Sequence, residues 1–361
     1  MIKKQFILIL FILTGYFTAG KAQTIVTIRG EQFLINNKLT YPGRSWKGNK
    51  IEGLLLNSRM IQGIFDDQNP ETVKNWQYAD TKKWDADRNT NEFVSAMKSW
   101  RDNGLLSFTI NLQGGSPQGY SNLQPWNNSA FSEDGSLKPE YLARLEKILT
   151  KADELGMIPI VGLFYFGQDE RLRDEAAVKK AVNNTIDWLF KKNYQNILIE
   201  IDNECNVKKY DHEILKPQRV SELIELAKSK TKNGNRFYVG TSFGGGAIPN
   251  TNVVKTSDFI LLHGNGVTNP DTILAMVKKT RAVQGYTPKP ILFNEDDHFN
   301  FDKDWNNFTA ALKGYASWGF FDYRMKDEKF EDGYQSIPVD WGINSERKRG
   351  FFKLLKEISG Y

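Results

Sequence analysis

The stretch Asn196-Ile197-Leu198-Ile199-Glu200-Ile201-Asp202-Asn203-Glu204 is an apolar run that ends in glutamate, and Pro290-Ile291-Leu292-Phe293-Asn294-Glu295 is a second one. Side chains alternate between the two faces of a strand, so Glu200, Asp202 and Glu204 share one face. Burial disfavours the charged form of a carboxyl group, so glutamates at the ends of two buried strands indicate a function. We predict that Glu204 and Glu295 are catalytic and that the deeper Glu200 and Asp202 are structural.

Short apolar strands alternate with amphipathic helices from residue 54 onward. This alternation predicts parallel strands, and eight such units predict a closed (β/α)8 TIM barrel with a short N-terminal β-hairpin extension. The expected strands are 60–65, 106–112, 158–164, 197–201, 237–240, 259–262, 290–293 and 319–323. The expected helices are 91–103, 139–155, 175–193, 217–233, 270–284, 304–318 and 345–359, with at most a turn of helix in 244–257.

The chain start predicts an export signal. A basic start is followed by a short apolar run and the small-residue motif Gly20-Lys21-Ala22, so we expect cleavage before Gln23 and a periplasmic, cell-surface or secreted bacterial protein. The expected division is 1–22 signal peptide, 23–53 hairpin segment and 54–361 catalytic barrel, with no transmembrane segment after cleavage.

The net charge and the cysteine content bear on two other classes, nucleic-acid-binding proteins and proteins with internal disulfides. Of the basic residues, Lys3, Lys4 and Lys21 lie in the signal segment, which has no acid, so its removal reduces the formal charge from +5 to +2. This small excess argues against a nucleic-acid partner. Cys205 is the one cysteine, so the chain forms no internal disulfide.

Long loops rich in aromatic and polar residues follow the first, second and eighth strands, at the barrel face where active sites form. Sugar rings present apolar C–H faces, so we expect aromatic loop residues to contact a carbohydrate. The expected substrate-binding residues are Asn203, His263, Asn294, Gln113, Tyr165, Trp126, Trp341, Arg59 and Tyr323. Arg59 is also an expected ion-pair partner of the buried carboxylates.

Metal catalysis is not expected, because three histidines are too few for the usual multi-histidine sites. The run Asp296-Asp297-His298 remains a candidate for a structural cation, and we expect no cofactor.

Glu200-Ile201-Asp202-Asn203-Glu204 on the fourth strand, with Glu295 ending the seventh, resembles the clan A glycoside hydrolases, of which family 5 is the best known. The resemblance covers 54–358 and implies a (β/α)8 barrel, a retaining mechanism, Glu204 as acid/base and Glu295 as nucleophile. Three positions depart from family 5. Cys205 replaces a proline, Asn265 replaces the tyrosine that steadies the nucleophile, and 321–324 lacks the usual tryptophan.

We therefore predict an exported retaining glycoside hydrolase that cleaves a poly- or oligosaccharide, in which burial and Glu295 raise the pKa of Glu204. One alternative is a substrate-assisted, family 18-like glycosidase, in which Glu295 is dispensable. The other is a non-catalytic carbohydrate-binding barrel. The sequence sets neither the sugar nor the oligomeric state.

Overall fold

Eight parallel strands form a closed barrel in the computed structural model, which describes residues 23–121 and 123–361. Six strands pair in the order β10-β9-β8-β7-β6-β13, and β11 pairs with β12. Backbone hydrogen bonds close the two seams, from Asp258 N to Val239 O (2.9 Å) and from Phe293 N to Ser317 O (2.9 Å). The barrel strands are β6 (Asn57–Arg59), β7 (Ser107–Asn111), β8 (Ile158–Tyr165), β9 (Leu198–Asn203), β10 (Tyr238–Gly240), β11 (Ile260–His263), β12 (Ile291–Glu295) and β13 (Gly319–Phe320).

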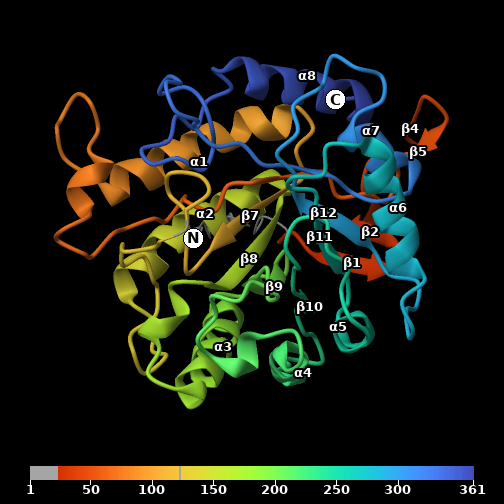
Figure 1. Cartoon of the computed structure of the whole chain (residues 1–361). Helices are drawn as coiled ribbons and strands as arrows, with labels where there is room; N and C mark the ends of the chain where they lie inside the picture. The colour runs from red at the N-terminus through yellow and green to blue at the C-terminus, as the bar shows by residue number, and fades with distance from the viewer. Residues whose placement is uncertain (1–22, 122) are drawn as a thin grey trace, which may run out of the picture.

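Helices surround this barrel and confirm the predicted (β/α)8 fold (Figure 1). Side chains cap several of them: Asp85 accepts from Arg88 N (2.8 Å) and Asp174 from Ala177 N (2.8 Å). The segment 244–257, where a turn of helix was expected, contains the short α5. The helices are α1 (Ala86–Asp102), α2 (Pro139–Leu155), α3 (Glu175–Lys191), α4 (Val220–Ser229), α5 (Thr251–Thr256), α6 (Pro270–Arg281), α7 (Asn307–Lys313) and α8 (Glu346–Ser359).

The predicted position of the first barrel strand is wrong. The sequence favoured 60–65, whereas β6 is Asn57–Arg59 and pairs with β7 in the register Arg59↔Thr109. Asn57, Ser58 and Arg59 are polar and buried between two apolar runs, so hydrophobic patterning does not reveal the strand, and alternation turns Arg59 and Asn57 to the same face. Arg59 therefore ends the strand at the working face of the barrel.

The N-terminal segment covers the opposite, N-terminal end of the barrel. The expected hairpin is present as β1 (Val26–Arg29) and β2 (Gln32–Ile35), extended by β3 (Lys38–Leu39), and a second hairpin joins β4 (Ser45–Trp46) to β5 (Asn49–Lys50). Val26 N donates to Gln195 O (3.0 Å), just before β9. The buried Phe33 ring packs edge-on against Phe259, with 6.5 Å between ring centroids.

The predicted export signal, residues 1–22, lies outside the described residues and stays a prediction. In the described part of the chain, no helix is long and apolar enough to cross a membrane.

Phe33→Ala tests how firmly the N-terminal sheet closes the barrel. Phe33 is 1% exposed, so removing its ring leaves a cavity, and we expect the free energy of unfolding to fall by about 3–5 kcal/mol. Urea unfolding followed by tryptophan fluorescence measures the change. The matched control Phe330→Ala alters a ring that is 45% exposed and should change stability by less than about 0.5 kcal/mol. Equal losses in the two variants would contradict this role of Phe33.

Candidate active site

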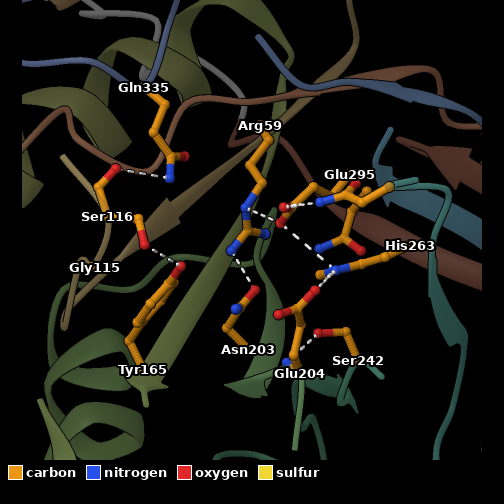
Figure 2. A network of polar contacts seen from close by, with 12 residues as sticks. Arg59, Gly115, Ser116, Tyr165, Asn203, Glu204, Ser242, His263, Glu295 and Gln335 are labelled. Carbon is orange, nitrogen blue, oxygen red and sulfur yellow. Dashed lines mark hydrogen bonds and ion pairs between the residues drawn. The ribbon is translucent and has the colours of Figure 1, made fainter. Parts of the chain in front are cut away.

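Glu204 and Glu295 meet at the mouth of the barrel (Figure 2). Glu295 is the last residue of β12, and Glu204 follows β9 directly. Oxygens of the two carboxyl groups and a ring nitrogen of His263 all lie within 4.8 Å of one another. Glu204 has φ 55°, a left-handed backbone that is strained for a residue with a side chain. Its N–H donates to Ser242 Oγ (2.9 Å), which helps to hold this conformation.

Arg59 joins the buried polar groups at the base of the site. Its Nε lies 2.5 Å from Glu295 Oε2, and its Nη2 donates to Asn203 Oδ1 (2.5 Å). Its Nη1 lies 3.8 Å from Glu200 Oε2. The guanidinium is 1% exposed, so little water screens these charges. Arg59 and Asn203, both predicted as site residues, are thus brought beside the two glutamates.

His263, the last residue of β11, lies between the two glutamates. Its Nδ1 is 2.9 Å from Glu204 Oε1 and 3.6 Å from Glu295 Oε2. Burial alone would lower the pKa of His263, but the charge of Glu295 and the hydrogen bond to Glu204 raise it above its ordinary value. The imidazole is therefore suited to hold a proton beside Glu204.

The sequence did not single out Asn265 as a site residue. Its Nδ2 donates to Glu295 Oε1 at 2.5 Å, from the position where the resemblance placed a tyrosine that steadies the nucleophile. The position of Asn265, two residues after His263, could have identified it. An asparagine stands there instead of the expected tyrosine, so the sequence does not indicate this role.

The two carboxyl groups have opposite pKa shifts. Burial raises the pKa of Glu295 above its usual value, although Arg59 and His263 oppose this effect. Burial acts in the same direction on Glu204, but the hydrogen bond from His263 and the charges of His263 and Arg59 hold the pKa of Glu204 below its usual value. The expectation of a raised pKa for Glu204 is therefore wrong, because His263 adds a cation that the sequence does not place beside this carboxyl group. The glutamates and His263 titrate as one unit.

A cavity of about 260 Å³ opens above the pair. Tyr165, a predicted site residue, contributes a wall there, and its OH lies 3.2 Å from Ser116 Oγ. Aromatic side chains supply much of the lining, which suits the C–H faces of a sugar. The lining residues are Ser116, Tyr120, Ser121, Tyr165, Phe166, Glu204, Val207, Lys209, Glu295, Phe321 and Gln335.

Tyr165 is the one predicted substrate contact among these lining residues; Arg59, Asn203 and His263 lie beside the two glutamates, and the other five predicted contacts lie elsewhere. Gln113 is buried and donates to Ser129 Oγ (3.1 Å), and Asn294 lies below the site and donates to Glu200 Oε1 (3.3 Å). Tyr323 packs beside Tyr120, with 5.1 Å between ring centroids.

The two loop tryptophans are structural. Trp126 is 3% exposed and packs edge-on against Trp76, while Trp341 is 2% exposed and donates to Asn89 Oδ1 (3.0 Å). The expectation that Trp126 and Trp341 contact sugar is corrected here, because a buried ring has no free face.

Two groups of described residues have ligand atoms close enough for a metal ion: Glu204 with His263 and Glu295, and Asp296 with Asp297 and His298. In the second group, Asp296 already accepts from Trp318 Nε1 (2.9 Å), Asn307 Nδ2 (3.0 Å) and His298 Nδ1 (2.7 Å). These donors satisfy the buried carboxylate, so we assign it a structural role.

Comparisons with known proteins show that the fold is a known one. No protein-family model matches the chain, and no curated protein matches it in sequence. An endo-1,4-beta-mannanase from Rhizomucor miehei is similar in structure, at 13% identity and TM-score 0.56, over 93% of this chain and 99% of that one. A GH5-4 broad specificity endoglucanase from Bacteroides salanitronis gives 12% identity and TM-score 0.53, over 85% and 93%.

A third similar structure, from Bacteroides vulgatus ATCC 8482, has 13% identity and a TM-score of 0.55. The alignment covers 90% of the present chain and 60% of the Bacteroides vulgatus chain. At such low sequence identity, the structural similarity shows a shared fold and nothing more. The resemblance to family 5 expected from the sequence is confirmed as a shared (β/α)8 barrel.

Histidine titration tests the electrostatics of the site. The folded-state pKa of His263 is raised, so its protonated ring stabilises the fold below about pH 6.5, and this contribution is lost as the pH rises through the folded-state pKa. We expect NMR to show a midpoint for His263 above its ordinary value, and Glu204→Gln to lower that midpoint by removing a charge. The control Asp297→Asn should lower the midpoint of His298 instead. An unchanged His263 midpoint in Glu204→Gln would contradict the assigned contact.

Proposed function

We propose that this protein is an exported retaining glycoside hydrolase that cleaves a glycosidic bond by double displacement. The observation that carries the proposal is that one oxygen of Glu204 lies within 4.8 Å of one oxygen of Glu295, with His263 Nδ1 2.9 and 3.6 Å from the two carboxyl groups. Retaining enzymes need a separation of roughly 5 Å, whereas inverting enzymes need roughly 6.5–9.5 Å to admit a water. The basic and apolar chain start supports export.

In the first step, Glu295 attacks the anomeric carbon while Glu204 gives a proton to the leaving oxygen, which breaks the glycosidic bond. In the second step, Glu204 takes a proton from water, and the oxygen of that water displaces Glu295 from the sugar. Arg59 and Asn265 orient Glu295 and favour its ionised form. Glu295 thereby remains a nucleophile in spite of its burial.

His263 can supply the proton that Glu204 needs as an acid, although the pKa of Glu204 is lowered. One proton lies between His263 Nδ1 and Glu204 Oε1, which are 2.9 Å apart. When sugar displaces water, the ion pair loses solvation and the neutral arrangement is favoured, with the proton on Glu204 and a neutral imidazole. Glu204 then holds the proton that the leaving group needs.

We propose β-1,4-linked glucan or mannan as the substrate class. The structural neighbours include an endo-1,4-beta-mannanase and a broad specificity endoglucanase. The aromatic rings of Tyr165, Phe166 and Phe321 at the cavity suit the apolar faces of such sugars.

A family 18-like mechanism has less support, because Glu200 and Asp202 are fully buried below the site while Glu295 faces Glu204. That mechanism predicts that Glu295 is dispensable. A non-catalytic carbohydrate-binding barrel predicts sugar binding without hydrolysis in the unaltered protein. Measuring both properties for the wild type and Glu295→Ala distinguishes these alternatives from the proposal.

Substitution of each glutamate tests the mechanism. Glu204→Gln should lower kcat on unactivated oligosaccharides by about 10²–10⁴-fold, because the acid/base is lost. On an aryl glycoside whose leaving group needs no proton, Glu204→Gln should still release the aryl group in a burst, whereas Glu295→Gln should not. Glu222→Gln, which alters an exposed ion pair with Arg219, is the matched control and should keep wild-type activity. Near-wild-type hydrolysis by both Glu204→Gln and Glu295→Gln would refute the proposal.

Asn265→Ala tests the residue that the sequence did not identify. Losing a hydrogen bond to a charged group costs about 1.5–3 kcal/mol, so we expect kcat/KM to fall by about 10–100-fold. The hydrogen bond from Asn265 lowers the pKa of Glu295, so its removal should move the acidic limb of the pH profile to higher pH. Asn252→Ala, which removes contacts to Pro217 O on the outside of the barrel, should shift neither quantity. A pH profile unchanged by Asn265→Ala would exclude this role.

A further inference from the structure

One side of the barrel mouth is closed by a contact between loops from distant strands. The OH of Tyr120, in the loop after β7, donates to Asp297 Oδ2 (2.8 Å), in the loop after β12. These two strands flank β6 and β13, so the contact passes above the ends of both. The other carboxylate oxygen of Asp297 accepts from Gly266 N (3.2 Å), in the loop after β11.

The loop after β7 is fixed by packing as well as by this hydrogen bond. The Tyr120 ring packs edge-on against Phe321 and Tyr323, with centroid separations of 5.8 and 5.1 Å. Gly119 lies so close to Tyr323 that an added Cβ would be 2.4 Å from its ring. Behind it, Ile337 N donates to Pro117 O (2.8 Å), which ties the loop to the one after β13. Tyr120 and Asp297 thus belong to a wall, and Tyr120 also lines the catalytic cavity.

The wall lies on the Glu295 side of the site, and its outer surface is open to solvent, since Tyr120 is 57% exposed. Asp297 is two residues beyond Glu295. On the Glu204 side, three residues in the loops after β9 and β10 are exposed: Asn206, Lys208 and Gly245. The loop after β9 bonds to the loop after β10 beside it, through Gly244 N and Asn206 Oδ1 (2.7 Å).

We propose that this protein acts on chain ends, removing a short product from the non-reducing end of its glycan. The inference rests on the proposed function of the same site. The sugar attacked by Glu295 stays on the Glu295 side, and the leaving group extends past Glu204, which protonates it. A wall on the Glu295 side leaves no path for a chain that continues beyond the bound sugar.

The size of the cavity agrees with this assignment. Its volume of about 260 Å³ is small beside the roughly 300–1,000 Å³ of pockets that enclose drug-sized ligands, which suits a short terminal segment of a glycan. Two fold neighbours are named endo-1,4-beta-mannanases, and the prefix endo means cleavage within a chain. The wall would make this protein differ from them by restricting cleavage to chain ends.

Oligosaccharides with a blocked non-reducing end test the inference in the full-length protein. We would compare β-1,4-linked gluco- and manno-oligosaccharides, free or carrying a benzylidene group on the terminal non-reducing sugar, each with a fluorophore at the reducing end. Wild type should shorten the free compounds stepwise and lose hydrolysis of the blocked ones. Equal cleavage of free and blocked compounds would overturn the chain-end inference and leave the proposed function intact. Cleavage of neither series would overturn the proposed function, and this inference with it.

Variants of Tyr120 test whether the wall sets this preference. Tyr120→Ala removes the ring and should restore cleavage of blocked compounds, with products of mixed length. Tyr120→Phe keeps the ring packing and should still reject them. The matched hydroxyl control is Tyr286→Phe, since the Tyr286 OH bonds to Lys289 O on the outside of the barrel, and it should behave as wild type. Continued rejection of blocked compounds by folded Tyr120→Ala would assign the preference to another feature and overturn the role of the wall.

A binding measurement checks the same inference without turnover. The variant Glu204→Gln allows binding to be measured without hydrolysis. A polymer that is about tenfold shorter has about ten times as many ends per unit mass. If the site binds ends, the half-saturating mass concentration should therefore fall about tenfold. A half-saturating mass concentration independent of chain length would contradict binding by ends.

Discussion

The buried guanidinium of Arg59 is the constraint on which the site depends. Glu200 and Glu295 are both buried, and the oxygens of Glu204 and Glu295 lie within 4.8 Å of each other, an arrangement in which like charges repel. Arg59 contacts Glu295 and Asn203 directly and lies near Glu200, so one cation offsets several acceptors. Removing one partner of such a buried set leaves an uncompensated charge, which typically costs about 3–5 kcal/mol. The polar ends of β6, β9 and β12 are therefore coupled parts of one arrangement.

This coupling explains what could be predicted from the sequence. Alternation along 196–204 placed Glu204 at the tip of its strand, and the order of apolar runs placed Glu295 at another, because period and length are local properties. The same pattern failed at Asn57-Ser58-Arg59. All three residues of that strand are polar, so they lack the apolar signal, and the pattern favours the neighbouring run at 60–65.

Roles that depend on tertiary packing could not be predicted. Trp126 and Trp341 resemble exposed loop aromatics in the sequence, but they pack against Trp76 and Phe93 from other segments. Asn265 was noted only as a missing tyrosine, since an amide two residues beyond a strand has many structural uses. The lowered pKa of Glu204 depends on His263, which is distant in sequence, so neither the burial nor the position of the carboxyl group alone indicated its direction.

At two of the positions that depart from the family 5 pattern, the residue present makes its own hydrogen bond beside a glutamate. Asn265 donates to Glu295 where a tyrosine was expected, and Cys205, in place of a proline, uses its N–H to bond Ser242 O (3.0 Å). That bond is available only to a residue other than proline, and it lies beside the bond from Glu204 N to Ser242 Oγ. The strained backbone at Glu204 is thus held by the loop after β10. In this chain a donor therefore lies beside each carboxyl group, Asn265 beside Glu295 and His263 beside Glu204, although Asn265 is not the residue type that the resemblance implied.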